Sequence, residues 1–442
     1  MLVQALRSVI YPTTTHRFHT TIPLLWLVVF MGAFQATYLV ITGQMNAEGG
    51  REMADIAERM VLGFGYSSPY LPTGEGGPTR VSPPLYVWLI GAVYWLLGIK
   101  TEAANTVLHL MNIAFNGITL VTLYDVNRKW FGERFAQLYA LVFSVQPHIL
   151  LLTGGIWEST LTLMFLALIL KYVVCGFNPD QIMHWLKLGI LFGLTALCNP
   201  AWTLMYPLLC LLLLGSARLL QQPSRSVSCI MIAVIAYGVI ISPWLIRNHN
   251  ASGTLSYIRN MDGPELYKGN HPAALGGHGT LFAEYWIYKS PEQQHLYQEM
   301  GEADYDRYML ERAMSIIVED PLRYTGKIIM RIAMWYSGDV DALLYWHEVE
   351  NWKKFSFGIV LTAFGIVTGG LALYGTWAMR KLNTDHYPER LWSLWIYVYF
   401  LPVPYFLIIT GFRYQASLMP FTLIPALYAL TYLQSKCAHT RK

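Results

Sequence analysis

Apolar runs of roughly 18 to 25 residues, the length that an α-helix needs to cross about 30 Å of hydrocarbon, recur from Ile22 to near the C-terminus. Hydrophobic residues make up 54% of the chain and charged residues only 13%, which excludes an ordinary soluble domain. We therefore expect an all-α, polytopic membrane protein. The expected crossings, about ten by hydropathy, are 22–41, 103–124, 135–153, 157–174, 185–199, 202–214, 227–246, 355–377, 391–409 and 418–433.

The apolar segment 85–98 decides the expected topology. With about 14 residues it is short for a crossing and suits a helix that lies on the membrane surface. If it does lie there, the basic residues of the short loops fall on the N-terminal side, as the positive-inside rule requires. They are Arg128, Lys129, Arg134, Lys187, Arg218, Arg225, Arg380, Lys381, Arg390, Lys436, Arg441 and Lys442. We therefore expect both termini on the cytoplasmic side, with residues 1–21 as a retained tail.

The same topology places two long polar segments, 46–84 and 248–352, on the outer face. We expect one membrane domain, 1–442, with a first outer loop at 46–98 that carries interfacial helices and is catalytic. The large outer loop at 248–352 should carry amphipathic helices. Ser290 followed by Pro291 predicts one helix start there, and Asp320 followed by Pro321 predicts another.

Composition also bears on the partners. The net charge is +4, but the Lys and Arg residues gather at the ends of apolar runs and form no single basic stripe, so topology explains them better than nucleic-acid binding. The five cysteines lie in or beside apolar runs or in the C-terminal tail, and their spacing indicates neither a disulfide framework nor a CxxC metal pair.

The first outer loop begins with a cluster of ionisable residues: Glu48, Arg51, Glu52, Asp55, Glu58 and Arg59. Ionisable groups beside hydrocarbon are costly and usually mark function. Residues 51–62 predict a short helix that ends at Gly63. Asp55 and Arg59 could simply pair on its solvated face. Glu48 and Glu52 lie at its start, where a desolvated carboxylate can serve as a general base, so we interpret this loop as the active site.

Seven short motifs carry a resemblance to a known family. They are IAxxxxxGxGY at 56–66, GPT at 77–79, PPLYxWL at 83–89, IWES at 156–159, GLTALCNP at 193–200, SPWLIRN at 242–248 and RYQASLMP at 413–420. In this order they resemble the GT-C superfamily of membrane glycosyltransferases, in particular its protein O-mannosyltransferase and aminoarabinose transferase branch. The resemblance implies a GT-C type bundle of about ten transmembrane helices with outer-face juxtamembrane helices, and a polyprenyl-phosphate-linked sugar as donor.

The resemblance also implies the site residues. The family's first-loop acid usually lies at the position of Gly49 here, so either Glu48 or Glu52 can be the catalytic acid, and we favour Glu52 slightly. Many relatives bind the donor phosphate with a Lys where this chain has Ser82, and Arg80 is the candidate replacement. Glu158 would bind substrate or a divalent metal ion, or else only complement a helix dipole. The remaining implied substrate-binding residues are Arg51, Tyr86, Arg247, Asn248 and Arg413.

Arg247 and Arg413 are also singled out by charge, because both lie at the outer end of a crossing, against the positive-inside rule. Their side chains could snorkel to the interface. Alternatively, their guanidinium groups could bind the donor phosphate through two hydrogen bonds each. The histidines have no metal-site spacing, so we expect no other metal site.

The predicted function is transfer of a sugar from a polyprenyl-phosphate donor to an acceptor hydroxyl, by a single displacement that inverts the anomeric carbon. The site would face outward from a bacterial-type inner membrane, and the acceptor could be a glycan, a lipid or a protein. The alternative is a flippase or transporter of a polyprenyl-linked sugar. Transporters tend to show inverted repeats and charges at the midplane, and neither is evident in the sequence.

Overall fold

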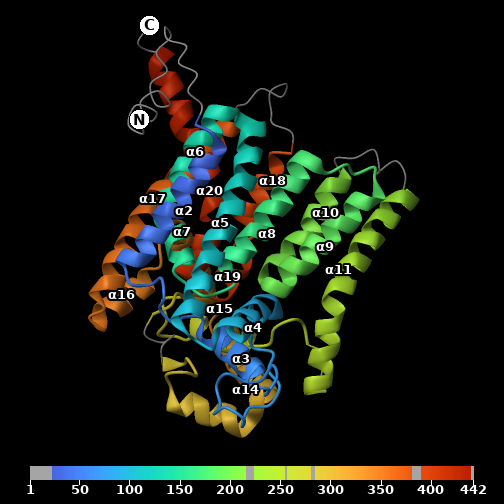
Figure 1. Ribbon diagram of the computed structural model, residues 1–442, viewed down its shortest axis with the longest axis vertical. Helices are drawn as coiled ribbons and strands as arrows, with labels where there is room; N and C mark the ends of the chain where they lie inside the picture. Colours follow the sequence, from blue (N-terminus) through green and yellow to red (C-terminus); the bar gives the residue numbers. More distant parts are fainter. Residues whose placement is uncertain (1–21, 216–222, 254–255, 280–283, 381–389, 440–442) are drawn as a thin grey trace.

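The computed structural model describes residues 22–215, 223–253, 256–279, 284–380 and 390–439. Most of its helices run side by side as a bundle, and a layer of shorter helices and loops lies across one end (Figure 1). α2 begins and α20 ends at the opposite end of the bundle. We call these the loop end and the terminal end. Both long polar segments lie at the loop end, as expected.

Each expected crossing coincides with helices of the bundle. They are α2 (Leu24–Ile41), α5 (Glu102–Phe131), α6 (Glu133–Val145), α7 (Pro147–Thr153), α8 (Ser159–Lys171), α9 (Ile182–Cys198), α10 (Met205–Gly215), α11 (Pro223–Ser252), α17 (Trp352–Met379), α18 (Trp392–Trp395), α19 (Val403–Leu407) and α20 (Phe412–His439). Within the described residues, six helices are long and apolar enough to cross a membrane, or seven if α6 and α7 form one span. The expected crossings at 185–199, 202–214 and 391–409 are shorter apolar helices.

One expected crossing is bent. Residues 135–153 form α6 and α7, which meet at an angle of 54°. Pro147 is the first residue of α7, and it has no N–H group with which to continue the hydrogen bonding of α6. The proline therefore accounts for the break in this span.

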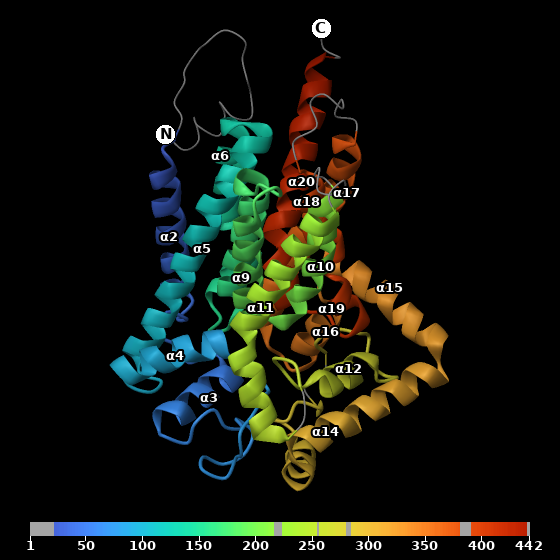
Figure 2. The same cartoon turned by 90° about the vertical axis from the view of Figure 1, so that its right-hand side faces the viewer.

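The layer at the loop end contains α3 (Arg51–Val61), α4 (Pro84–Leu97), α12 (Asp262–Asn270), α14 (Pro291–Glu319), α15 (Pro321–Ser337) and α16 (Val340–Glu348). α3 and α4 lie beneath the bundle (Figure 2). α4 buries Tyr86, Ile90 and Tyr94 but exposes 75% of Trp95 and 68% of Leu96. A helix of this length with exposed apolar side chains suits the membrane surface, as the sequence predicts for 85–98.

Both predicted helix starts of the large loop are present. The Ser290 hydroxyl accepts a hydrogen bond from the Gln293 backbone N–H at the start of α14. The Asp320 carboxylate accepts one from the Arg323 N–H at the start of α15, at 2.9 Å. These side chains satisfy backbone donors that a helix leaves unpaired at its first turn.

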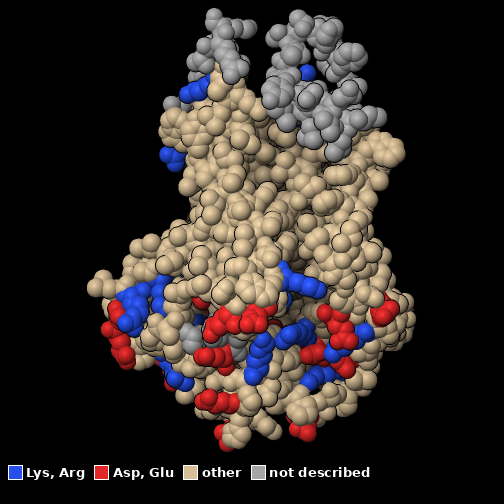
Figure 3. Space-filling view, turned by 90° about the vertical axis from the view of Figure 1, so that its left-hand side faces the viewer, with Lys and Arg blue, Asp and Glu red and all other residues tan. Residues whose placement is uncertain are grey.

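Charge divides the molecule along its long axis. Figure 3 shows an uncharged band over the bundle, with Lys, Arg, Asp and Glu side chains mixed at the loop end. On this face, the charged side chains that the structure describes at the terminal end are Lys or Arg. An uncharged band between two polar ends is what a membrane-spanning bundle requires.

Candidate active site

The start of α3 packs directly against the segment that leads into α8. Gly50 has a φ of +77°, in the left-handed region that favours glycine, and a Cβ on it would lie 2.5 Å from the carbonyl oxygen of Ile156. Only a glycine allows this approach without displacement of the backbone. The contact brings the acidic start of α3 to the same corner of the loop end as Glu158, two residues after Ile156.

Neutral groups hold the Glu52 carboxylate. The Tyr70 hydroxyl donates to Glu52 Oε1 at 2.8 Å, and the Trp286 indole N–H donates to the same oxygen at 3.5 Å. Burial, and then the Glu52 charge, raise the pKa of Tyr70 well above its usual value, so this hydroxyl stays protonated and can donate. Arg51 stacks 4.5 Å from the centre of the Trp286 ring. Glu48, in contrast, is exposed.

Glu158, which is buried, forms an ion pair with Arg413, whose side chain is 28% exposed, between the start of α8 and the start of α20. The Arg413 Nε also donates to the Ser159 hydroxyl at 3.1 Å, and its guanidinium lies 4.7 Å from the centre of the Trp157 ring. Asn199 donates to the other carboxylate oxygen of Glu158 at 3.3 Å. Glu158 makes no side-chain cap to α8, so its main role in the structure is to fix the Arg413 guanidinium.

Tyr86 lies behind this pair and is buried. Its hydroxyl donates to Asn112 Oδ1 on α5 at 3.1 Å, and the same oxygen accepts from the Thr160 hydroxyl on α8 at 2.7 Å. Tyr86 therefore joins α4 to α5 and α8, and it stabilises the wall of the site from behind.

A further charged group comes from the large loop. Lys268 Nζ lies 3.0 Å from Glu265 Oε1, and Arg259 Nη2 lies 3.9 Å from the same oxygen. Burial alone would raise the pKa of Glu265, but Lys268 and Arg259 hold it below its usual value. Both Arg259 Nε and Glu265 Oε2 are buried without a hydrogen-bond partner. Buried polar atoms without a partner are rare and often face a ligand.

These groups share one electrostatic environment. Burial lowers the pKa of Arg259, but Glu265, Asp262 and Glu52 more than offset this and raise it above its usual value. Arg413 also interacts electrostatically with Glu52 as well as with Glu158. We call the set the central charge cluster: Glu52, Glu158, Arg259, Glu265, Lys268, His278 and Arg413.

His278 closes the cluster on the side of α20. A Cβ on Gly411 would lie 2.0 Å from His278 Nδ1, and the His278 ring centre lies 5.6 Å from that of Tyr414. Burial lowers the pKa of His278 to about 4, and the nearby Lys268 and Arg413 charges lower it against the opposing effect of Glu265. The imidazole is therefore neutral at physiological pH.

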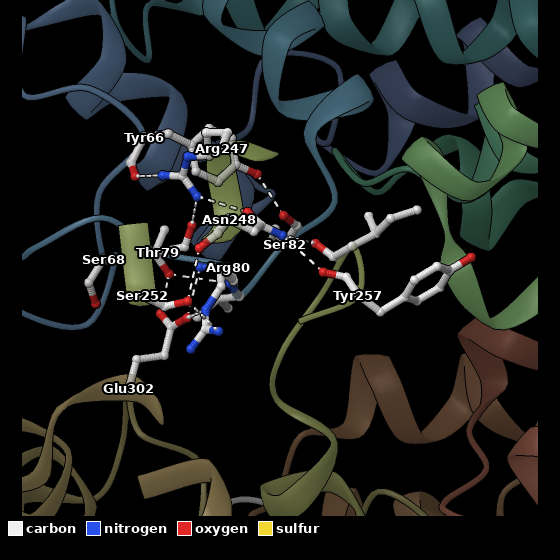
Figure 4. A network of polar contacts seen from close by, with 12 residues as sticks. Tyr66, Ser68, Thr79, Arg80, Ser82, Arg247, Asn248, Ser252, Tyr257 and Glu302 are labelled. Carbon is white, nitrogen blue, oxygen red and sulfur yellow. Dashed lines mark hydrogen bonds and ion pairs between the residues drawn. The ribbon is translucent and has the colours of Figure 1, made fainter. Parts of the chain in front are cut away.

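Arg80 and Arg247, two of the predicted substrate-binding residues, belong to a neighbouring polar network (Figure 4). Glu302 accepts from the Arg80 backbone N–H at 2.8 Å and from Arg80 Nε at 3.4 Å. Arg247 donates to the backbone oxygens of Thr79 at 2.5 Å and Tyr66 at 2.7 Å. Both guanidinium groups thus bind atoms of the protein itself in this structure.

The network supports the segment that carries Arg259. Asn248 Nδ2 donates to the Tyr257 carbonyl at 2.9 Å, and the Asn260 N–H donates to the Arg80 carbonyl at 2.9 Å. The backbone is therefore held on both sides of Arg259. Arg80 and Asn248 contact this segment directly, and Arg247 binds the first loop beside it.

The structure brings some predicted residues together and separates others. Glu52, Glu158 and Arg413 join the central charge cluster, and Tyr86 lies behind it. The predicted pairing of Asp55 with Arg59 is wrong: Lys100 Nζ lies 2.7 Å from Asp55 and 2.6 Å from Glu58, while Arg59 donates to the Leu71 carbonyl.

Sequence reasoning missed four members of the cluster: Arg259, Glu265, Lys268 and His278. In the sequence they are ordinary charges in a long polar loop. One signal was available, because Arg259 and Lys268 lie on the outer side of the predicted topology, as Arg247 and Arg413 do.

The region of the predicted metal ion is occupied by protein groups. Arg413 and Asn199 bind the two oxygens of the Glu158 carboxylate. Across the described part of the chain, no three or more His, Cys, Asp or Glu side chains gather as a metal-ligand set. Glu158 would need a new set of neighbours to bind a cation.

Comparison with known proteins gives one sequence match and several structural ones. Residues 81–246 match a family model described as dolichyl-phosphate-mannose-protein mannosyltransferase. No curated protein matches the chain. The fold is similar to a crystal structure of the Archaeoglobus fulgidus oligosaccharyltransferase tethered with an acceptor peptide, with a TM-score of 0.50 and 13% identity over 95% of this chain and 50% of that one. This chain thus spans half the length of the Archaeoglobus protein.

A second similar structure is that of ArnT from Cupriavidus metallidurans bound to undecaprenyl phosphate, with a TM-score of 0.43 and 14% identity over 92% of this chain and 78% of that one. The apo state of the same ArnT has a TM-score of 0.38. The helical bundle has the expected GT-C type fold, and the match over 81–246 confirms the resemblance of this chain to the mannosyltransferase branch of the GT-C membrane glycosyltransferases.

Proposed function

We propose that the protein is a glycosyltransferase that moves a sugar from a polyprenyl-phosphate donor to an acceptor hydroxyl. The observation that carries the proposal is the Glu52 carboxylate, which the neutral Tyr70 and Trp286 side chains hold and which interacts electrostatically with the guanidinium groups of Arg259 and Arg413. A base next to anion-binding groups is what this transfer requires. The family model, described by a dolichyl-phosphate-mannose donor, supports a lipid phosphate as the activating group.

The chemistry would be a single displacement at the anomeric carbon. The acceptor oxygen forms a bond to this carbon while its proton passes to Glu52, and the bond from the carbon to the donor phosphate oxygen breaks. The electron pair of that bond leaves with the lipid phosphate. Attack from the face opposite to the leaving group inverts the anomeric centre. Glu52 is preferred to Glu48 as the base because Glu48 is exposed and outside the cluster.

Arg259 is the proposed main ligand of the donor phosphate. Its Nε is buried without a partner, and its ion pair with Glu265 is long, at 3.9 Å. Arg413 is more fully committed, since it binds Glu158 and Ser159. A planar guanidinium can donate two parallel hydrogen bonds to a phosphate, and these strengthen as negative charge develops on the leaving oxygen.

The loop end would face outward from a bacterial-type inner membrane, with both termini in the cytoplasm. This orientation rests on the positive-inside rule, because Arg128, Lys129 and Lys171 lie at the terminal end. The acceptor hydroxyl, of a glycan, a lipid or a protein, would then reach Glu52 from the outer side. A divalent cation at Glu158 stays a secondary proposal, which a test below addresses.

Transfer of radiolabelled sugar from polyprenyl-phosphate donors, in membranes that contain the wild type or a variant, tests the proposal. We expect Glu52→Gln to lose about 100-fold or more of the transfer rate, the usual range for a general base. The transfer rate of Glu48→Gln should stay within a few fold of the wild-type rate. Glu58→Gln is the matched control, since it changes the same charge on the same helix at a residue bound to Lys100.

If Glu52→Gln transferred sugar at the wild-type rate, at equal expression, the assignment of Glu52 as the base would be refuted. Failure of the wild type with every donor, together with donor-lipid translocation in proteoliposomes, would instead favour the flippase. The two outcomes separate an error in the mechanism from an error in the class of protein.

A further inference from the structure

Glu265 belongs to the central charge cluster but has no role in the displacement described above. Its Oε1 atom lies 3.0 Å from Lys268 Nζ. Its Oε2 atom is buried and has no hydrogen-bond partner among the residues that the structure describes. With a pKa below the usual value, the carboxylate is ionised at physiological pH. A buried polar atom is seldom left without a partner, and a donor group of a bound ligand would satisfy this one.

The helix that carries Glu265 is fixed at both ends. α12 lies between the bundle and α14 (Figure 2). At its start, the Gly263 N–H donates to Asp306 Oδ1 on α14 at 2.9 Å. At its end, the Arg331 guanidinium donates to Asn270 Oδ1 at 2.8 Å. The Glu265 carboxylate therefore projects from a fixed backbone, as a group that selects a ligand requires.

The neighbour of Glu265 is Arg259, the proposed ligand of the donor phosphate. Arg259 Nη2 lies 3.9 Å from Glu265 Oε1, so the two side chains line the same part of the cluster. Arg259 Nε is a buried donor and Glu265 Oε2 a buried acceptor, and neither has a partner in the described part of the chain. Arg259 also interacts electrostatically with Glu52, the proposed base. The site thus offers a donor for an anion and, next to it, an ionised acceptor.

We infer that Glu265 Oε2 accepts a hydrogen bond from the 2-hydroxyl of the donor sugar, so that the transferred sugar has a free hydroxyl at C2. The inference rests on the proposed function, in which Arg259 holds the phosphate. In such a donor the phosphate is bonded to the anomeric carbon, and C2 is the next carbon of the ring. Because Oε2 is buried, a small hydroxyl suits it better than a bulky acetamido group. In glycoside hydrolysis, hydrogen bonds to the 2-hydroxyl strengthen in the transition state, so Glu265 would contribute to the rate as well as to the choice of sugar.

The test measures kcat/KM for transfer by the full-length protein in membranes, with undecaprenyl-phosphate-linked β-mannose or β-glucose and with their common 2-deoxy analogue. Loss of the 2-hydroxyl alone would speed the reaction, because this oxygen withdraws electrons from the anomeric carbon. We expect the wild type to use the 2-deoxy donor about 10- to 100-fold less well, the effect of one hydrogen bond to a charged group. In Glu265→Gln, the ratio of kcat/KM for the two donors should fall about fivefold or more, because a neutral amide accepts a weaker hydrogen bond.

A ratio of two donors on one variant does not depend on how much of that variant is folded. If transfer by Glu265→Gln is too slow to measure, the ratio of the two dissociation constants, from quenching of tryptophan fluorescence, replaces it. Asp262→Asn is the matched control, because Asp262 is an exposed acid in the first turn of the same helix, and its ratio should equal that of the wild type.

Equal use of both donors by the wild type, or an unchanged ratio in Glu265→Gln, would overturn the inference. Transfer of N-acetylglucosamine as fast as that of glucose would overturn the assignment to a 2-hydroxyl. Failure of the wild type with every polyprenyl-phosphate donor would instead defeat the proposed function on which the inference rests.

Discussion

Replacement of Glu158 by Gln leaves the Arg413 guanidinium beside a neutral amide, and we expect it to lower the free energy of unfolding by about 3 kcal/mol. Loss of one partner of a buried pair typically costs about 3–5 kcal/mol, because the other charge stays buried without compensation. The lower end applies here, since the Arg413 side chain is 28% exposed and keeps its hydrogen bond to Ser159 and its contact with the Trp157 ring.

A double-mutant cycle isolates the pair itself. Arg413→Gln should cost about as much as Glu158→Gln, since it leaves the buried carboxylate with only the Asn199 amide. The double variant leaves neither charge uncompensated. Its cost should therefore be about 2 kcal/mol smaller than the sum of the two single costs, within the range measured for residues in contact.

The assay is reversible unfolding in mixed detergent micelles, followed by tryptophan fluorescence. Asp304 and Arg307 provide the control cycle, because they form an ion pair of 3.2 Å whose side chains are both 63% exposed. The coupling of such an exposed pair should stay below about 0.5 kcal/mol. A Glu158–Arg413 coupling as small as that of the control would refute the argument that burial makes this pair a structural necessity.

Three further predictions follow from individual contacts. Gly50→Ala should reduce sugar transfer at least about tenfold, because a Cβ there meets the Ile156 carbonyl. Gly43→Ala is the control, since Gly43 has a φ of +69° and thus the same backbone strain, but open space around it. Equal losses of transfer in both variants would contradict the reasoning. Burial raises the pKa of Asp339 to about 7 from 3.8, so its folded form binds a proton more readily, and its contribution to stability is lost as the pH rises through 7. The free energy of unfolding of Asp339→Asn, relative to that of the wild type, should therefore be higher at pH 8 than at pH 5. The same difference in free energy at both pH values would be evidence against the raised pKa. Because protein groups bind both oxygens of Glu158, EDTA should leave transfer within about twofold in the membrane assay, and a loss that Mn²⁺ or Mg²⁺ restores would show a metal requirement instead.

Much of the architecture could be predicted because the membrane limits the choices. Apolar length alone locates the helices of the bundle. Length and charge together predict a surface position for 85–98, where the structure has a 14-residue helix with exposed apolar side chains. Local capping rules locate the starts of α14 and α15, because a cap involves residues three positions apart.

The pairing of charges could not be predicted in the same way. Arg80 meets Glu302, a residue 222 positions later, and no local pattern marks that contact. The motifs singled out Arg80 and Arg247 as phosphate ligands, yet both bind protein groups and lie beside the segment of Arg259. A motif can mark a residue as a candidate ligand, but the hydrogen-bond partner of its side chain depends on how distant loops fold onto each other.

The Glu158–Arg413 pair has a consequence for biosynthesis. The two residues are separated by 255 positions, so the ribosome completes α8 long before α20 enters the membrane. Until then the Glu158 carboxylate has no Arg413 guanidinium to pair with. A nascent chain therefore lacks the finished site while its earlier spans insert, and the arrival of α20 both neutralises that acid and supplies the arginine that interacts electrostatically with Glu52. Stalled or truncated chains should be recognisable to membrane quality control by this unpaired charge.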